Sequence, residues 1–172
     1  MAKRYTNEER ARDLHDLLRR IRLTTVDPTI YRQAHEAGEL ASAAVGAFNN
    51  ARAMDADFGG GSSVAWSDRS KGSRWLAKAR KILQGIGDDT AKAPRGTPSI
   101  ANVLFLRRVA EKAHTGERFR ALMVDKYEFD PCVGAGWIEM RAPNCDPYWV
   151  LTAAGSDILA RFSDLAEGIE AA

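Results

Sequence analysis

Cysteine and histidine are the side chains of this sequence best suited to nucleophilic or metal chemistry, and both are scarce. The chain has two cysteines, Cys132 and Cys145, and three histidines among its 172 residues. A zinc site would have to combine His114 with both cysteines and a fourth ligand, because no C-x-x-C pair is present. No local signature of a catalytic cysteine surrounds Cys145. We therefore expect no catalytic activity, no metal and no cofactor.

A glycine-rich stretch from Asp57 to Ser63, DFGGGSS, is the second candidate for ligand chemistry. A phosphate-binding P-loop needs the wider frame G-x-x-x-x-G-K-[ST] after a strand, and Lys71 and Gly72 do not supply that frame. Three consecutive glycines are typical of a flexible joint. We interpret residues 59–72 as a Gly/Ser-rich joint between two parts of the chain.

The distribution of charge points to an anionic partner. The net charge is +2 overall, but it is −1 over residues 1–68, +8 over 69–108 and −5 over 109–172. The stretch 70–84, SKGSRWLAKARKILQ, contains no acid, and on a helical wheel its cations gather opposite its apolar residues. Two arginines of the next helix and one beside a later turn extend the set. The candidate phosphate-contacting residues are Lys71, Arg74, Lys78, Lys81, Arg107, Arg108 and Arg141.

These cations suit more than one kind of partner. DNA phosphates are one, and an acidic protein surface is the other, so the sequence leaves DNA binding and protein interaction open. A membrane surface is disfavoured because the apolar side of residues 70–84 is narrow and rich in alanine. No apolar run approaches the roughly 18 residues needed to cross a bilayer, and the N-terminus lacks the apolar core of a signal peptide. We expect a cytoplasmic protein.

Capping signals predict helices in residues 1–58. Thr6 and Glu9 form a capping box before an apolar stripe, Leu14, Leu17, Leu18 and Ile21. Asp27 and Pro28 then mark a new helix start, and an alanine-rich segment follows to about Met54, as one helix or two. Small residues at helical spacing favour close approach of another helix. We interpret residues 1–58 as a helical arm or a dimerisation hairpin, and the protein as a candidate homodimer.

Residues 73–172 are expected to form a second, mainly helical domain. An apolar helix is predicted over residues 99–114 and a shorter one over 117–126, followed by extended chain around Pro131. Alternating segments on either side of a turn, Ala142 to Pro147, predict an antiparallel β-hairpin, and Thr152 is placed to cap a last helix. The predicted fold is mainly α, with five to six helices and one small hairpin near the C-terminus.

The hairpin and last helix resemble the wing and final helix of winged-helix DNA-binding domains of the MarR and PadR type. The matching residues are Gly136, Ile138, Trp149, Leu151, Thr152, Gly155 and Ile158 or Leu159. The resemblance implies a small bacterial or phage regulator with a recognition helix in the major groove and a wing beside it. Two features depart from the family: residues 127–135 separate the expected recognition helix from the hairpin, and the turn carries Asp146. We therefore expect the basic helix near Lys78 to be the better candidate for the DNA contact.

Overall fold

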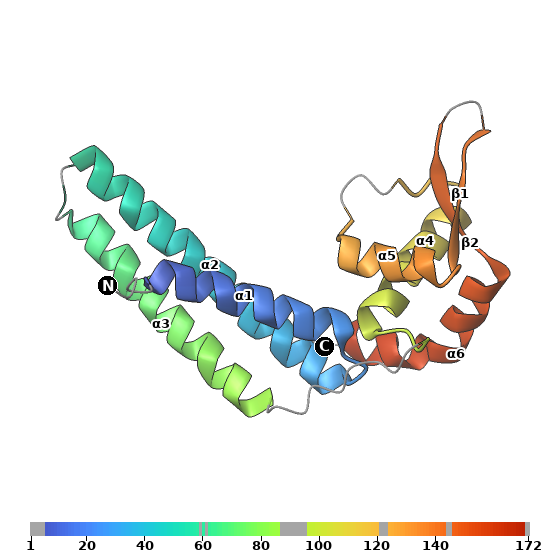
Figure 1. The fold of residues 1–172 in the computed structure, drawn as a ribbon, viewed down its shortest axis with the longest axis horizontal. Helices are drawn as coiled ribbons and strands as arrows, with labels where there is room; N and C mark the ends of the chain where they lie inside the picture. Colours follow the sequence, from blue (N-terminus) through green and yellow to red (C-terminus); the bar gives the residue numbers. More distant parts are fainter. Residues whose placement is uncertain are drawn as a thin grey trace. The chain divides into compact units, whose positions relative to one another are not determined.

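The computed structural model describes residues 6–58, 60, 62–86, 96–120, 124–143 and 146–170. Over these residues the fold is mainly α, with six helices and one two-stranded antiparallel hairpin near the C-terminus, which confirms the predicted fold class (Figure 1). The elements are α1 (Asn7–Thr24), α2 (Pro28–Phe58), α3 (Ser63–Ile86), α4 (Ile100–His114), α5 (Lys126–Gly134), β1 (Ile138–Arg141), β2 (Tyr148–Leu151) and α6 (Ala153–Glu170).

The elements group into two compact units. The N-terminal unit comprises Met1–Arg22 and Arg32–Thr90, and the C-terminal unit comprises Leu23–Tyr31 and Ala91–Ala172. This division differs from the expected one into residues 1–58, 59–72 and 73–172. Residues 63–72, expected in a flexible joint, lie in α3, and α3 groups with the two helices that precede it.

Local sequence signals start the first two helices of the chain as predicted. The Thr6 amide donates to Glu9 Oε2 (2.8 Å), and the Glu9 amide donates to Thr6 Oγ1 (3.2 Å), which completes the capping box. Asp27 Oδ1 accepts from the amides of Thr29 (2.7 Å) and Ile30 (3.1 Å) at the start of α2. The apolar stripe of α1 is narrower than expected: Leu14, Leu18 and Ile21 are buried, whereas Leu17 is exposed.

Helix α2 is a single helix of 31 residues that Gly38 and Gly46 do not interrupt. In Figure 1 it lies beside α1 and α3 within the unit. Its alanine-rich side, which suggested a second copy of the chain as partner, is buried within this chain. The buried residues of α2 are Ala34, Ala37, Ala41, Ala44, Ala47, Phe48 and Ala51.

Close packing against α2 explains why α3 continues through the expected joint. Gly72 is buried, and a Cβ atom at this residue would lie 3.0 Å from two ring carbons of Phe48. Gly72 therefore lets the two helices approach closely rather than ending α3. Ala65, Leu76 and Ala79 are buried on the same side of the helix. Burial of this face compensates for the cost of one glycine in a helix, about 1 kcal/mol.

The C-terminal unit is organised around the apolar helix α4. Phe105, Leu106 and Val109 are buried together with Trp137 and Ile138 from the start of the hairpin. The Phe105 ring meets the rings of Phe119 and Phe129 edge to face, with centroids 5.5 Å and 6.1 Å apart. Hairpin, α4 and α5 therefore share one aromatic core.

The segment between α4 and β1 differs from the prediction. Residues 117–120 and 124–125 are not helical, and residues 121–123 lie outside the described residues. Phe119 instead forms an isolated antiparallel bridge with Trp149, whose amide donates to the Phe119 carbonyl (2.9 Å). A helix, α5, forms instead around Pro131, where extended chain was expected. Burial of Cys132 and packing of Phe129 against the core offset the backbone hydrogen bond that proline removes.

The hairpin and its junction with α6 match the prediction closely. Ile138 pairs with Leu151 and Arg141 with Tyr148. Thr152 Oγ1 donates to the Gly136 carbonyl (2.7 Å) and accepts from the Gly155 amide (3.1 Å), so Thr152 caps α6 and ties it to the hairpin.

Candidate nucleic-acid interface

The clearest candidate surface is one side of α3, which we call the α3 basic face. It consists of Lys71, Arg74, Lys78 and Lys81, all of which are exposed. At 3.6 residues per turn these four positions fall within an arc of about 80°, on the opposite side of the helix from the buried residues. Lys71 and Lys81 are ten residues apart, which is about 15 Å along the helix axis. The predicted amphipathic arrangement is therefore present in the fold.

Within the described residues, three of these four cations have no ion-pair partner. Lys71 Nζ lies 3.7 Å from Asp68 Oδ1. Arg74, Lys78 and Lys81 make no ion pair with any residue in the described part of the chain. The cause lies in the sequence, because α3 has no acidic residue after Asp68 that could neutralise a cation one turn away. The α3 basic face is thus an exposed, mostly unneutralised row of positive charge.

The other three predicted residues lie in the C-terminal unit and are engaged there. Arg107 donates to the Ser163 carbonyl (3.3 Å). Arg108 pairs with Glu128 (2.5 Å), and its guanidinium lies 5.7 Å from the centroid of the Phe105 ring. Arg141 pairs with Glu139 (2.9 Å) on the same strand. The structure therefore divides the seven candidates into four residues on α3 and three that already have partners in the other unit.

Two further arginines, not selected from the sequence, lie at the hairpin. Arg118 and Arg120 both pair with Asp146, and the distance from Arg120 Nη2 to Asp146 Oδ1 is 3.0 Å. The Arg118 guanidinium lies 5.2 Å from the centroid of the Tyr148 ring. The two arginines flank Phe119, whose bridge to Trp149 fixes the local backbone. In extended chain alternate side chains point to opposite sides, so Phe119 enters the core while both arginines point outward. The alternation of charged and apolar residues in Arg118-Phe119-Arg120 is the sequence pattern that indicates this extended segment.

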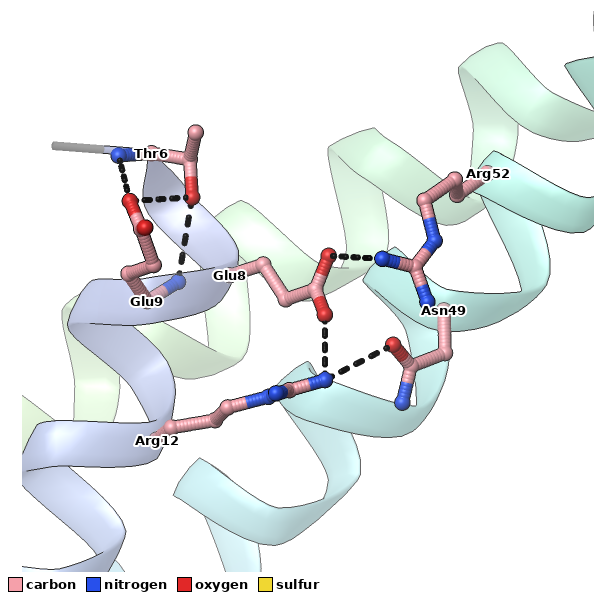
Figure 2. Close-up of polar contacts among 6 residues, drawn as sticks. All are labelled: Thr6, Glu8, Glu9, Arg12, Asn49 and Arg52. Atoms are coloured by element: carbon pink, nitrogen blue, oxygen red, sulfur yellow. Dashed lines mark hydrogen bonds and ion pairs between the residues drawn. The ribbon is translucent and has the colours of Figure 1, made fainter. Parts of the chain in front are cut away.

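A hollow in the N-terminal unit is a second candidate for a ligand site. It has a volume of about 270 Å³, and Figure 2 shows the polar contacts beside it. Glu8 pairs with Arg12 (2.5 Å) and with Arg52 (3.7 Å), and Arg69 pairs with Asp55. The charges of this hollow therefore largely neutralise one another. Its lining residues are Thr6, Asn7, Glu8, Phe48, Arg52, Asp55, Arg69 and Ser73.

The buried cysteine is unsuited to nucleophilic chemistry. Burial, reinforced by the nearby Glu128 carboxylate, raises the pKa of the Cys132 thiol to about 12. Its Sγ donates to the Glu128 carbonyl (3.3 Å). At neutral pH this group is a thiol and not a thiolate, which is the reactive form. Cys145 lies outside the described residues, and among the residues that are described no group of three or more His, Cys, Asp or Glu could hold a metal ion.

Comparison of the chain with protein-family models, with curated proteins and with solved structures finds no match. None of the helices in the described ranges is long and apolar enough to span a membrane.

Proposed function

We propose that this protein is a non-catalytic DNA-binding protein that contacts phosphates through the α3 basic face. The observation that carries the proposal is the row of exposed cations in which Arg74, Lys78 and Lys81 have no ion-pair partner among the described residues. Such charges are already available to an anion, so binding does not require an internal ion pair to be broken. A phosphate contact also releases counterions condensed on the nucleic acid, which favours association at low salt.

Arg107, Arg108 and Arg141 have a secondary role in this proposal. Each already donates to a group of the C-terminal unit, so a phosphate would have to compete with that partner. Arg108 has the strongest competitor, since Glu128 is its ion-pair partner and the Phe105 ring lies beneath its guanidinium. We therefore assign the main phosphate contact to α3.

The proposal includes a winged-helix-like arrangement of the C-terminal unit. In its favour, α5 ends at Gly134, only four residues before β1 begins, so the helix leads almost directly into the hairpin. The Phe119–Trp149 bridge adds a third extended segment beside β2. The charge of α5 does not favour groove recognition, because Lys126 is outnumbered by Glu128 and Asp130. The likeness therefore concerns the architecture, and the phosphate contact remains on α3.

The salt dependence of oligonucleotide binding tests the proposal. Four phosphate contacts predict a slope of log K against log salt of about −3.6 on duplex DNA. The double variant Lys78→Gln with Lys81→Gln should reduce that slope to about −1.8, as measured by fluorescence anisotropy with labelled oligonucleotides. Arg80→Gln is the matched control, because Arg80 is an exposed cation of the same helix that lies outside the α3 basic face. It should leave the slope unchanged.

Two outcomes would contradict the proposal. Absence of binding to duplex and to single strands at low salt would exclude DNA as the partner. An equal loss of affinity in Arg80→Gln and in the double variant would show a diffuse charge effect rather than a defined face. In the first case, the alternative function would apply, in which the same cations bind an acidic surface of another protein.

A further inference from the structure

Helix α2 ends and α3 begins at the same end of the N-terminal unit (Figure 1). Large aromatic side chains are exposed there. Phe58, the last residue of α2, is 69% exposed, and Trp66, in the first turn of α3, is 72% exposed. Aromatic rings of this size normally bury most of their surface, and a group of exposed apolar side chains is a candidate site of interaction. We call Phe58 and Trp66 the aromatic end.

The charge beside the aromatic end indicates the chemistry of its partner. Trp66 precedes Lys71 by five residues, about 7.5 Å along the helix axis, and the α3 basic face continues from there to Lys81. A ligand that covers both features must present flat apolar faces next to a row of negative charges. Unpaired nucleobases on a phosphodiester chain have this combination. In a duplex the base faces are covered by neighbouring base pairs and offer no surface to an indole ring.

We propose that single-stranded nucleic acid is the preferred partner, with bases stacked on Trp66 and Phe58 while the phosphates follow the α3 basic face. The inference rests on the proposed function, since the same cations serve both. It adds a preference that the cations alone do not create, because phosphates are present in single strands and in duplexes alike. Stacking on an aromatic ring requires no particular base, so the binding tolerates many sequences.

Anisotropy titrations with the full chain test this preference. The probes are a labelled oligothymidylate about 12 nucleotides long, within the site sizes known for single-strand binders, and a duplex of equal length. Trp66→Ala should weaken single-strand binding at least about five-fold and leave duplex binding unchanged. Trp66→Phe, which keeps a ring, should restore most of the affinity. Val64→Ala is the matched control, because Val64 is 53% exposed at the same end of α3 but cannot stack.

The outcomes separate this inference from the proposed function. If Lys78→Gln with Lys81→Gln weakens single-strand binding but Trp66→Ala does not, the preference is refuted and the α3 basic face stands. If no oligonucleotide binds, both proposals are refuted. If sedimentation shows self-association that Trp66→Ala abolishes while single-strand affinity is unchanged, the aromatic end is a contact between copies of the chain and the inference is overturned.

Discussion

Replacing Gly155 by alanine should destabilise the C-terminal unit, although alanine is the better helix former. Gly155 lies in the first turn of α6, where the helix approaches the backbone of Trp137. A Cβ atom built at this position would lie 2.0 Å from the Trp137 carbonyl oxygen and 2.9 Å from its carbonyl carbon. The nearest atoms belong to the backbone, so no side-chain rotation can relieve the clash.

The expected magnitude follows from the contacts at this junction. An ordinary contact between carbon and oxygen is roughly 3.3 Å, so α6 would have to move about 1.3 Å from the hairpin. Three hydrogen bonds span or cap the junction: Thr152 N to the Trp137 carbonyl (3.0 Å), Thr152 Oγ1 to the Gly136 carbonyl (2.7 Å) and Gly155 N to Thr152 Oγ1 (3.1 Å). Each contributes about 0.5–1.5 kcal/mol, whereas alanine gains about 1 kcal/mol in helix propensity. With overpacking strain included, we expect a net loss of about 2–4 kcal/mol.

Urea titration followed by far-UV circular dichroism measures this loss as a lower midpoint, by about 1–2 M. Gly46→Ala is the control, because Gly46 is also helical and a Cβ atom there meets nothing within 4 Å. It should stabilise the protein by about 0.5–1 kcal/mol. The reasoning would be refuted if Gly155→Ala were as stable as the wild type, or gained stability as Gly46→Ala does.

Two further predictions concern Cys132 and the cluster at Asp146. In a Cys145→Ser background, the Cys132 thiol should resist alkylation at neutral pH until the chain is denatured, and rapid labelling of the folded protein would contradict this. Because the pKa of this thiol is near 9.0 in the unfolded chain and about 12 in the folded one, the free energy of unfolding should fall as the pH rises through this window. Asp146→Asn should lower the free energy of unfolding by less than about 1 kcal/mol in a urea titration, since Arg118 and Arg120 are half exposed. The same variant should bind oligonucleotides more tightly at low salt, because one negative charge is removed. Weaker binding would show that Asp146 instead orients the two arginines for contact.

Predictions that depend on neighbours along the chain succeed in this protein. The caps at Thr6, Asp27 and Thr152 and the cation arrangement of α3 depend on residues within one or two turns, where side-chain chemistry fixes local geometry. The hairpin is predictable for the same reason, because two alternating segments are separated by one short turn.

Features that depend on distant partners could not be predicted in this way. Phe119 pairs with Trp149, thirty residues later, and this contact replaces the helix that local periodicity favours. The helix around Pro131 forms because Phe129 and Cys132, three residues apart, face the core of the C-terminal unit. Similarly, the convergence of Arg118 and Arg120 on Asp146 requires knowledge of which segment lies beside the hairpin.

The packing role of Gly72 also depends on a residue distant in the sequence and could not be predicted from its neighbours. A glycine after a run of glycines and serines indicates flexibility when neighbours alone are considered. The glycine is explained here by the Phe48 ring, 24 residues earlier, with which a Cβ atom at this position would be in tight contact. The cations lie opposite the apolar residues of this helix, as predicted, but the helix begins at Ser63, within the expected joint.

The inclusion of Leu23–Tyr31 in the C-terminal unit has a consequence for the order in which the protein forms during synthesis. Thr25 is buried, and its carbonyl accepts from the Ile100 amide (3.1 Å), a bond between residues separated by 75 positions. Residues 23–31 are synthesised well before α4, so this short segment must await its partners while the helices on either side of it are already made. Fragments that begin at residue 73 or 91 would lack this segment altogether, and the same bond could not form in them.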